Sequence, residues 1–125
     1  LDHYARAVAS GGALVSEARE KYGIALLDAG DYGRARDQFQ LALEGSDSGS
    51  VYLGLGTAEY LLGHRSAALG PIEKAVYRWP SHQDAWRVLL RVCAESDREA
   101  WLRKAERFLR AGEMKVLEQE IAGVD

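Results

Sequence analysis

The sequence predicts an all-α protein built from antiparallel helical hairpins. Apolar residues recur at spacings of three and four along almost the whole chain of 125 residues, as expected for the buried faces of helices. No sustained run alternates apolar with polar residues or collects β-branched side chains, so no strand is predicted. The length suits one domain over residues 1–125 and is too short for two ordinary domains.

The composition indicates a globular chain with little net charge. Hydrophobic residues make up 47% and charged residues 28%, and the formal net charge is -3. Nucleic-acid binding usually relies on a basic patch, and no such patch is evident, so we expect no nucleic-acid partner. No apolar run approaches the length of a membrane span, so we expect no membrane insertion. Cys93 is the only cysteine, and its helical spacing from Trp86 and Leu89 predicts a buried apolar role.

Glycine, serine and proline mark the predicted turns. Breaks between helices are predicted at Gly11-Gly12, Gly30-Asp31, residues 44–50, Gly63-His64, Pro80-Ser81, Ser96-Asp97 and Gly112. Ser81 is predicted to cap a helix, and Ser96 with Glu99 has the spacing of a capping box. Pro71 lies several residues into a predicted helix, which indicates either a kink or a later helix start.

The chain matches itself when it is shifted by 33 residues. The shift superimposes small residues: Gly23 on Gly56, Ala25 on Ala58, Gly30 on Gly63, Ala35 on Ala68, Ala42 on Ala75 and Ser48 on Ser81. A glycine inside a helix costs about 1 kcal/mol relative to alanine. Gly23 and Gly56, at the same phase of the two repeats, therefore predict close helix contacts that offset this cost.

This pattern resembles the tetratricopeptide repeat, a helix-turn-helix unit of about 34 residues. In residues 16–48 the matching positions are Tyr22, Gly23, Gly30, Asp31, Tyr32, Ala35, Phe39 and Ala42. In residues 49–82 they are Tyr52, Leu55, Gly56, Ala68, Ile72, Ala75 and Pro80. Residues 83–111 form a degenerate third unit, with Leu90 where a small residue belongs. The resemblance implies a right-handed superhelical array of antiparallel hairpins, an α-solenoid.

The remaining segments are predicted to flank this array. Residues 1–15 are expected to be a partial unit, with Tyr4, Ala7 and Val8 at the spacing of a second helix. The second helix of the third unit is predicted over about residues 98–110, where it would bury Trp101, Ala105, Phe108 and Leu109. Residues 112–125 are expected to form a terminal solvating helix with Met114, Leu117 and Ile121 on one face.

The resemblance also implies a function: a scaffold or adaptor that binds a partner peptide or protein in its concave groove. The groove positions carried over from the family are Glu20, Ile24, Leu27, Leu53, Thr57, Tyr60, Leu61, Arg87 and Arg91. Arg87 and Arg91 are four apart on one helix face, and two roles stay open for them. They could pair with a partner carboxylate or form salt bridges within the protein. Family members that clamp carboxylate tails use lysine and asparagine where this chain has Glu20 and Ile24, which argues against such a partner.

Two other functions are considered. The chain could be a structural segment of a larger repeat protein without its own ligand, and self-association through the array ends stays open. Gly54 and Gly56 also suggest a nucleotide- or S-adenosylmethionine-dependent enzyme, but no strand is predicted before them. Glu59 stands where the third glycine of a dinucleotide fingerprint belongs, so this function is improbable. Gly54 itself has no packing explanation, and a close approach by a groove ligand stays open.

No catalytic or metal-binding set is predicted. His3, His64 and His82 are expected at an end or in solvated turns, and no histidine–carboxylate set is inferred. We therefore expect no enzyme, no cofactor and no metal. The compartment is left open: the cytoplasm is slightly favoured, and the periplasm is an alternative if a signal sequence was removed before Leu1.

Overall fold

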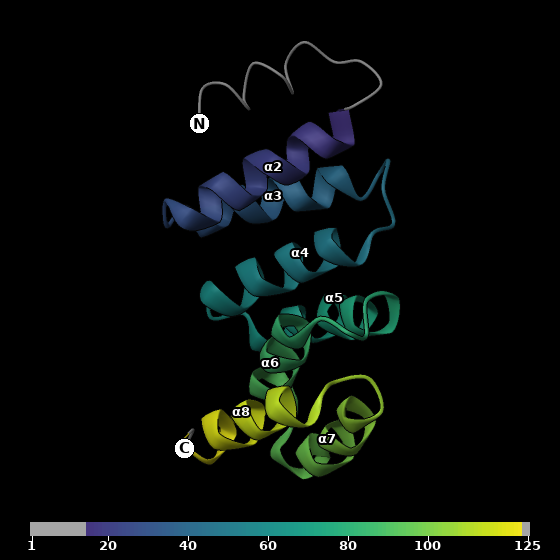
Figure 1. Ribbon diagram of the computed structural model, residues 1–125. Coiled ribbons are helices and arrows are strands. Elements are labelled where there is room, and N and C mark those ends of the chain that lie inside the picture. Colours follow the sequence, from purple (N-terminus) through teal and green to yellow (C-terminus); the bar gives the residue numbers. More distant parts are fainter. Residues whose placement is uncertain (1–14, 124–125) are drawn as a thin grey trace.

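The computed structural model describes residues 15–123, which form seven α-helices and one 3₁₀ turn (Figure 1). The α-helices are α2 (Val15–Asp28), α3 (Tyr32–Ala42), α4 (Gly49–Leu61), α5 (Arg65–Arg78), α6 (Gln83–Val92), α7 (Arg98–Glu106) and α8 (Ala111–Ala122); the turn is η1 (Glu95–Asp97). No strand occurs among these residues, so the all-α prediction is confirmed for them. The predictions for Gly11-Gly12, for His3 and for the partial unit over residues 1–15, apart from Val15, fall outside the described residues.

The turns of the first two hairpins are built identically. Gly30 follows α2 with φ of 81°, and Gly63 follows α4 with φ of 84°. In both turns the residue after the glycine donates its N–H to the carbonyl four residues before the glycine, at 2.9 and 2.8 Å. This Schellman motif needs a left-handed residue, which explains the glycines. Since the two glycines are 33 residues apart, the sequence repeat is also a repeat of backbone structure.

Glycines inside the helices allow large side chains to pack against the backbone. A Cβ atom added to Gly23 would lie 2.8 Å from the Phe39 ring, and one added to Gly54 would lie closer still to the same ring. A Cβ atom on Gly56 would collide with Ile72. The close contacts predicted for Gly23 and Gly56 are therefore confirmed. Gly54 also gains an explanation, since a side chain at this position would collide with the Phe39 ring.

The helices contact one another in the order of the chain. α2, α4 and α6 contact one another in succession, and α8 contacts α6. α3 lies against α2 and α4, and α5 lies against α4 and α6. Figure 1 shows the helices following one another from the purple α2 to the yellow α8. α2 and α3 occupy residues 16–48 apart from the first residue of α2, and α4 and α5 lie within residues 49–82. No helix between residues 15 and 123 is long and apolar enough to cross a membrane.

Two buried clusters hold the helices together. The first joins α2, α3 and α4, and its members include Tyr22, Leu26, Phe39 and Val51. The second extends from α5 to α8, and its members include Ile72, Trp86, Leu89, Cys93, Ala105, Leu109, Met114 and Leu117. Cys93 is 1% exposed, which confirms its predicted apolar role, and burial raises the pKa of its thiol.

The predicted N-caps of the third unit are wrong. Ser96 lies within η1, and Asp97 is the residue that precedes α7, without a capping hydrogen bond from its side chain. The residue preceding α6 is His82 rather than Ser81, and it also lacks a side-chain cap. Each helix begins one residue later than the predicted cap allows, so the spacing of serine and acidic residues did not locate the helix starts. Side-chain caps occur instead earlier in the chain, where Asp31 begins α3 and Ser48 begins α4.

The predicted burial of Phe108 is also wrong. α7 ends at Glu106 instead of near residue 110, and the chain turns before Phe108, whose side chain is left 51% exposed. Ala105 and Leu109 are buried as predicted, and Trp101 is half-buried. Pro71 lies at the seventh residue of α5, so the alternative of a later helix start is wrong. The terminal helix is confirmed as α8, which buries Met114 and Leu117, with Ile121 half-buried.

Candidate functional site

A largely apolar groove of about 490 Å³ lies between α2, α4 and α6. It brings together six of the nine positions carried over from the family: Glu20, Ile24, Leu27, Leu53, Thr57 and Arg87. α2 and α4 are the first helices of the two hairpins, and α6 is the helix that follows the second hairpin. Its apolar side chains are not all sheltered, since Ile24 is 47% exposed. Such a surface can receive apolar side chains of another molecule.

The charged groups of the groove are mostly paired within the protein. Glu20 accepts a hydrogen bond from the Ser50 hydroxyl at 2.7 Å. Arg87 donates to Glu120 at 2.7 Å and also contacts Asp84, so the structure favours salt bridges within the protein for Arg87. The hydrogen bond from Arg87 is the main reason that the pKa of Glu120 is lowered. The Arg87 guanidinium therefore already contacts two carboxylates of the same chain, those of Asp84 and Glu120.

Three predicted groove residues lie outside the cavity: Tyr60, Leu61 and Arg91. Tyr60 and Leu61 belong to the last turn of α4, beyond the part that faces α2 and α6, and Leu61 is 44% exposed. Arg91 lies close enough to Glu120 to lower the pKa of that carboxyl further, after the larger effect of Arg87. The structure therefore places its charge beside a carboxylate of the same chain.

Five lining residues were missed from the sequence: Ser50, Gly54, Trp79, Asp84 and Val88. Asp84 and Val88 could have been found, because Asp84 lies three residues before Arg87 and four before Val88, which groups the three on one side of α6. Trp79 carried no periodic signal, since it follows α5 as a C-cap. Its ring stacks on His82 with centroids 3.8 Å apart, which restrains the indole that lines the groove.

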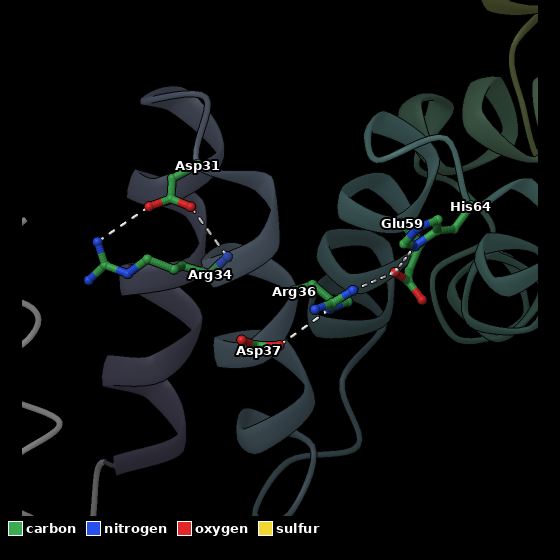
Figure 2. A network of polar contacts seen from close by, with 6 residues as sticks. All are labelled: Asp31, Arg34, Arg36, Asp37, Glu59 and His64. Carbon is green, nitrogen blue, oxygen red and sulfur yellow. Dashed lines mark hydrogen bonds and ion pairs between the residues drawn. The ribbon is translucent and has the colours of Figure 1, made fainter.

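A polar network joins α3, α4 and the start of α5 away from the groove (Figure 2). Glu59 is 9% exposed, and its carboxylate lies 3.1 Å from Nδ1 of His64 and 3.8 Å from Nη1 of Arg36. His64 is half-exposed in its turn, and its contact with Glu59 could not be inferred from the sequence. None of these three residues lines the groove, and the contacts tie the α4–α5 turn to α3. Figure 2 also shows Asp31, the cap of α3, holding Arg34.

The arrangement required by the nucleotide-binding alternative is missing. Gly54 and Gly56 lie inside α4, and the residues directly before them are helical rather than a strand. In the part of the chain that the structure describes, no group of three His, Cys, Asp or Glu side chains could hold a metal ion.

No protein-family model matches this chain, and no curated protein matches it either. The structure describes an all-α protein with a groove between α2, α4 and α6.

Proposed function

We propose that this chain is a tetratricopeptide-like interaction module, a right-handed array of hairpins that binds a peptide segment of another protein in its groove. The observation that carries the proposal is the cavity between α2, α4 and α6, to which each successive unit contributes one helix. The repeated turns at Gly30 and Gly63 support the array, because identical connections orient successive hairpins alike. The half-exposed Ile24 supports binding, because an apolar contact there would remove it from water.

The charges of the groove indicate the chemistry of the partner segment. Arg87 is already paired with Asp84 and Glu120, so a carboxylate of the partner would have to compete with both. Glu20 contributes a negative charge to the groove, and its Oε2 atom accepts a hydrogen bond from the Ser50 hydroxyl. A segment with two or three apolar side chains and one lysine or arginine near Glu20 therefore fits better than an acidic one.

Selection of peptides from a random displayed library against the immobilised protein tests this function. The selected peptides are expected to be apolar and basic and to alter the fluorescence of Trp79, which lines the groove. Ile24→Glu should weaken them by roughly tenfold or more, since it places a charge in the apolar contact. The measurement is fluorescence polarisation with labelled copies of the selected peptides.

Leu61→Glu is the matched control. Leu61 is exposed to nearly the same extent as Ile24, at 44% against 47%, but it does not line the cavity. It should leave peptide affinity unchanged. Peptides that bind equally well to the Ile24→Glu and wild-type proteins would show that the groove is not the binding surface. In that case the alternative of a structural segment without a groove ligand would be preferred.

A further inference from the structure

A second apolar cleft, of about 330 Å³, lies between α5, α6 and α7. Val76, Pro80 and Trp86 line its floor, and Tyr77 and Phe108 stand at its sides. These two side chains are the most exposed large hydrophobic ones among the described residues, at 62% and 51%. The cleft is near the lower end of the range for ligand pockets, about 300–1,000 Å³, which suits one anchoring side chain.

The cleft and the groove lie on opposite sides of α6. Asp84, Arg87 and Val88 line the groove, and their spacing of three and four places them on one helix face. Trp86 lines the cleft, and at about 100° per residue it points away from that face. A molecule in the cleft therefore does not compete with one in the groove, and the two surfaces can be tested separately.

The aromatic side chains of the cleft are held in place by one another. The Trp86 and Phe108 rings stack with centroids 6.4 Å apart, and Trp101 lies 6.4 Å from both Trp86 and Tyr77. The indole N–H of Trp86 donates to the carbonyl of Pro80 at 2.7 Å. Such rings lose little conformational entropy when a partner covers them, a property of aromatic residues that dominate interfaces.

The charges around the cleft are positive. Lys104 and Arg107 line it, both are exposed, and no carboxylate lines it. Neither cation forms an ion pair within residues 15–123, in contrast to Arg87 of the groove. Lys104 contacts only a ring face, with its Nζ 4.7 Å from the centroid of Trp101. Glu106, the carboxylate next to Arg107, lines a different cavity beside Met114.

We infer that the cleft binds a peptide segment of a partner protein in which an apolar or aromatic residue is flanked by carboxylates. The apolar residue inserts between Tyr77 and Phe108, and the carboxylates pair with Lys104 and Arg107. This inference is independent of the proposed function, because it concerns a different surface and the opposite charge.

The test uses two synthetic peptides of equal length. One has a phenylalanine between glutamate-rich flanks, and the other has lysine in place of each glutamate. Binding is measured by tryptophan fluorescence in a Trp79→Phe protein, so that only Trp86 and Trp101 report. We expect the glutamate peptide to bind at least roughly tenfold more tightly than the lysine peptide, and its affinity to fall with added salt.

Charge reversal then identifies the surface. Lys104→Glu with Arg107→Glu should remove the preference for the glutamate peptide or invert it. Arg103→Glu with Lys115→Glu is the control, since it makes the same change of charge at exposed residues that do not line the cleft. Phe108→Ala should weaken the glutamate peptide without a loss of helicity, which circular dichroism checks in every variant.

Three results would overturn the inference. Equal affinity for the two peptides would exclude charge recognition, and a preference that survives reversal of Lys104 and Arg107 would place binding elsewhere. Sedimentation showing a wild-type dimer that Phe108→Glu dissociates would assign the cleft to a second copy of the chain. None of these results depends on Ile24, so failure here is distinguishable from failure of the groove proposal.

Discussion

The first two hairpins pack through glycines, whereas the third unit packs through tryptophans. Gly23 receives the Phe39 ring and Gly56 receives Ile72, and these pairs are themselves 33 residues apart. In the third unit, Trp86 of α6 instead meets the Trp101 ring of α7 at 6.4 Å. Without a Cβ atom, a helix lets a neighbouring side chain reach its backbone, so each hairpin closes over its own large residue. Trp86 is buried there, whereas Trp101 is only half-buried.

The only two phenylalanines of the chain show the consequence of this difference. Phe39 is 0% exposed, because its ring lies against glycines of both α2 and α4. Phe108 is 51% exposed, because α7 ends before it and the ring lies at the side of the aromatic cleft. The glycine-packed part therefore uses its aromatic ring for stability. Phe108 instead leaves half of its surface in water.

The largest difference in stability is expected when each phenylalanine is replaced by alanine. Phe39→Ala removes a fully buried ring and leaves a cavity, which should lower the free energy of unfolding by about 3–5 kcal/mol. Phe108→Ala should lower it by less than about 1 kcal/mol, since half of that ring is already in water. Chemical denaturation of both variants measures the difference. Losses of similar size would show that Phe108 is a core residue and would contradict the contrast.

A substitution at Gly56 tests the glycine contacts with a smaller expected effect. Gly56→Leu must displace the buried Ile72 side chain, and overpacking of this kind costs about 1–3 kcal/mol. Gly33→Leu is the matched control, because Gly33 is also helical but has nothing near its missing Cβ. It should change the stability by about 0.5 kcal/mol or less. Equal thermal shifts in the two variants would mean that Gly56 does not serve close packing.

The same contrast explains how far the fold could be predicted from the sequence. The hairpins were predictable because their glycines are placed by local rules: Gly30 and Gly63 end helices, and Gly23 and Gly56 recur at one phase. The role of Gly54 could not be predicted, because the Phe39 ring that requires a glycine there belongs to the preceding hairpin. The predicted end of α7 was also wrong, because the apolar spacing continues through Phe108 although the helix ends at Glu106.

The helices that line the groove could be predicted from the sequence, but the ion pairs of its charged residues could not. The family pattern placed Ile24 and Leu53 correctly on the lining, since their positions within each unit are fixed by helix geometry. It did not show that Glu120, from α8 near the end of the described chain, would pair with Arg87. It also could not show Trp79, which lies at a helix end outside any periodic pattern. Contacts between distant segments depend on how the helical units pack against one another, and the sequence of a single repeat does not determine that packing.

The smallest effect is expected from the ion pair that joins the third unit to α8. The hydrogen bond from Arg87 lowers the pKa of Glu120 below its ordinary value of 4.5 in the folded protein. A carboxyl whose folded pKa is lowered adds stability above the unfolded value, and this contribution disappears as the pH falls through the folded value. Glu120→Gln should therefore lower the thermal midpoint at neutral pH, and the difference from wild type should shrink progressively below pH 4.5.

Glu118→Gln is the control for this pH dependence. Glu118 is exposed on the same helix and forms no ion pair within residues 15–123, so its replacement should leave the wild-type pH profile unchanged. A difference between Glu120→Gln and wild type that stays constant at all pH values would show that the charge of Glu120 is not what stabilises α8. Because Arg87 and Glu120 are both partly exposed to water, the pair should be weaker than the packing of Phe39. Packing of buried rings would then set the stability of the hairpins, with charge making a smaller, pH-dependent contribution at the third unit.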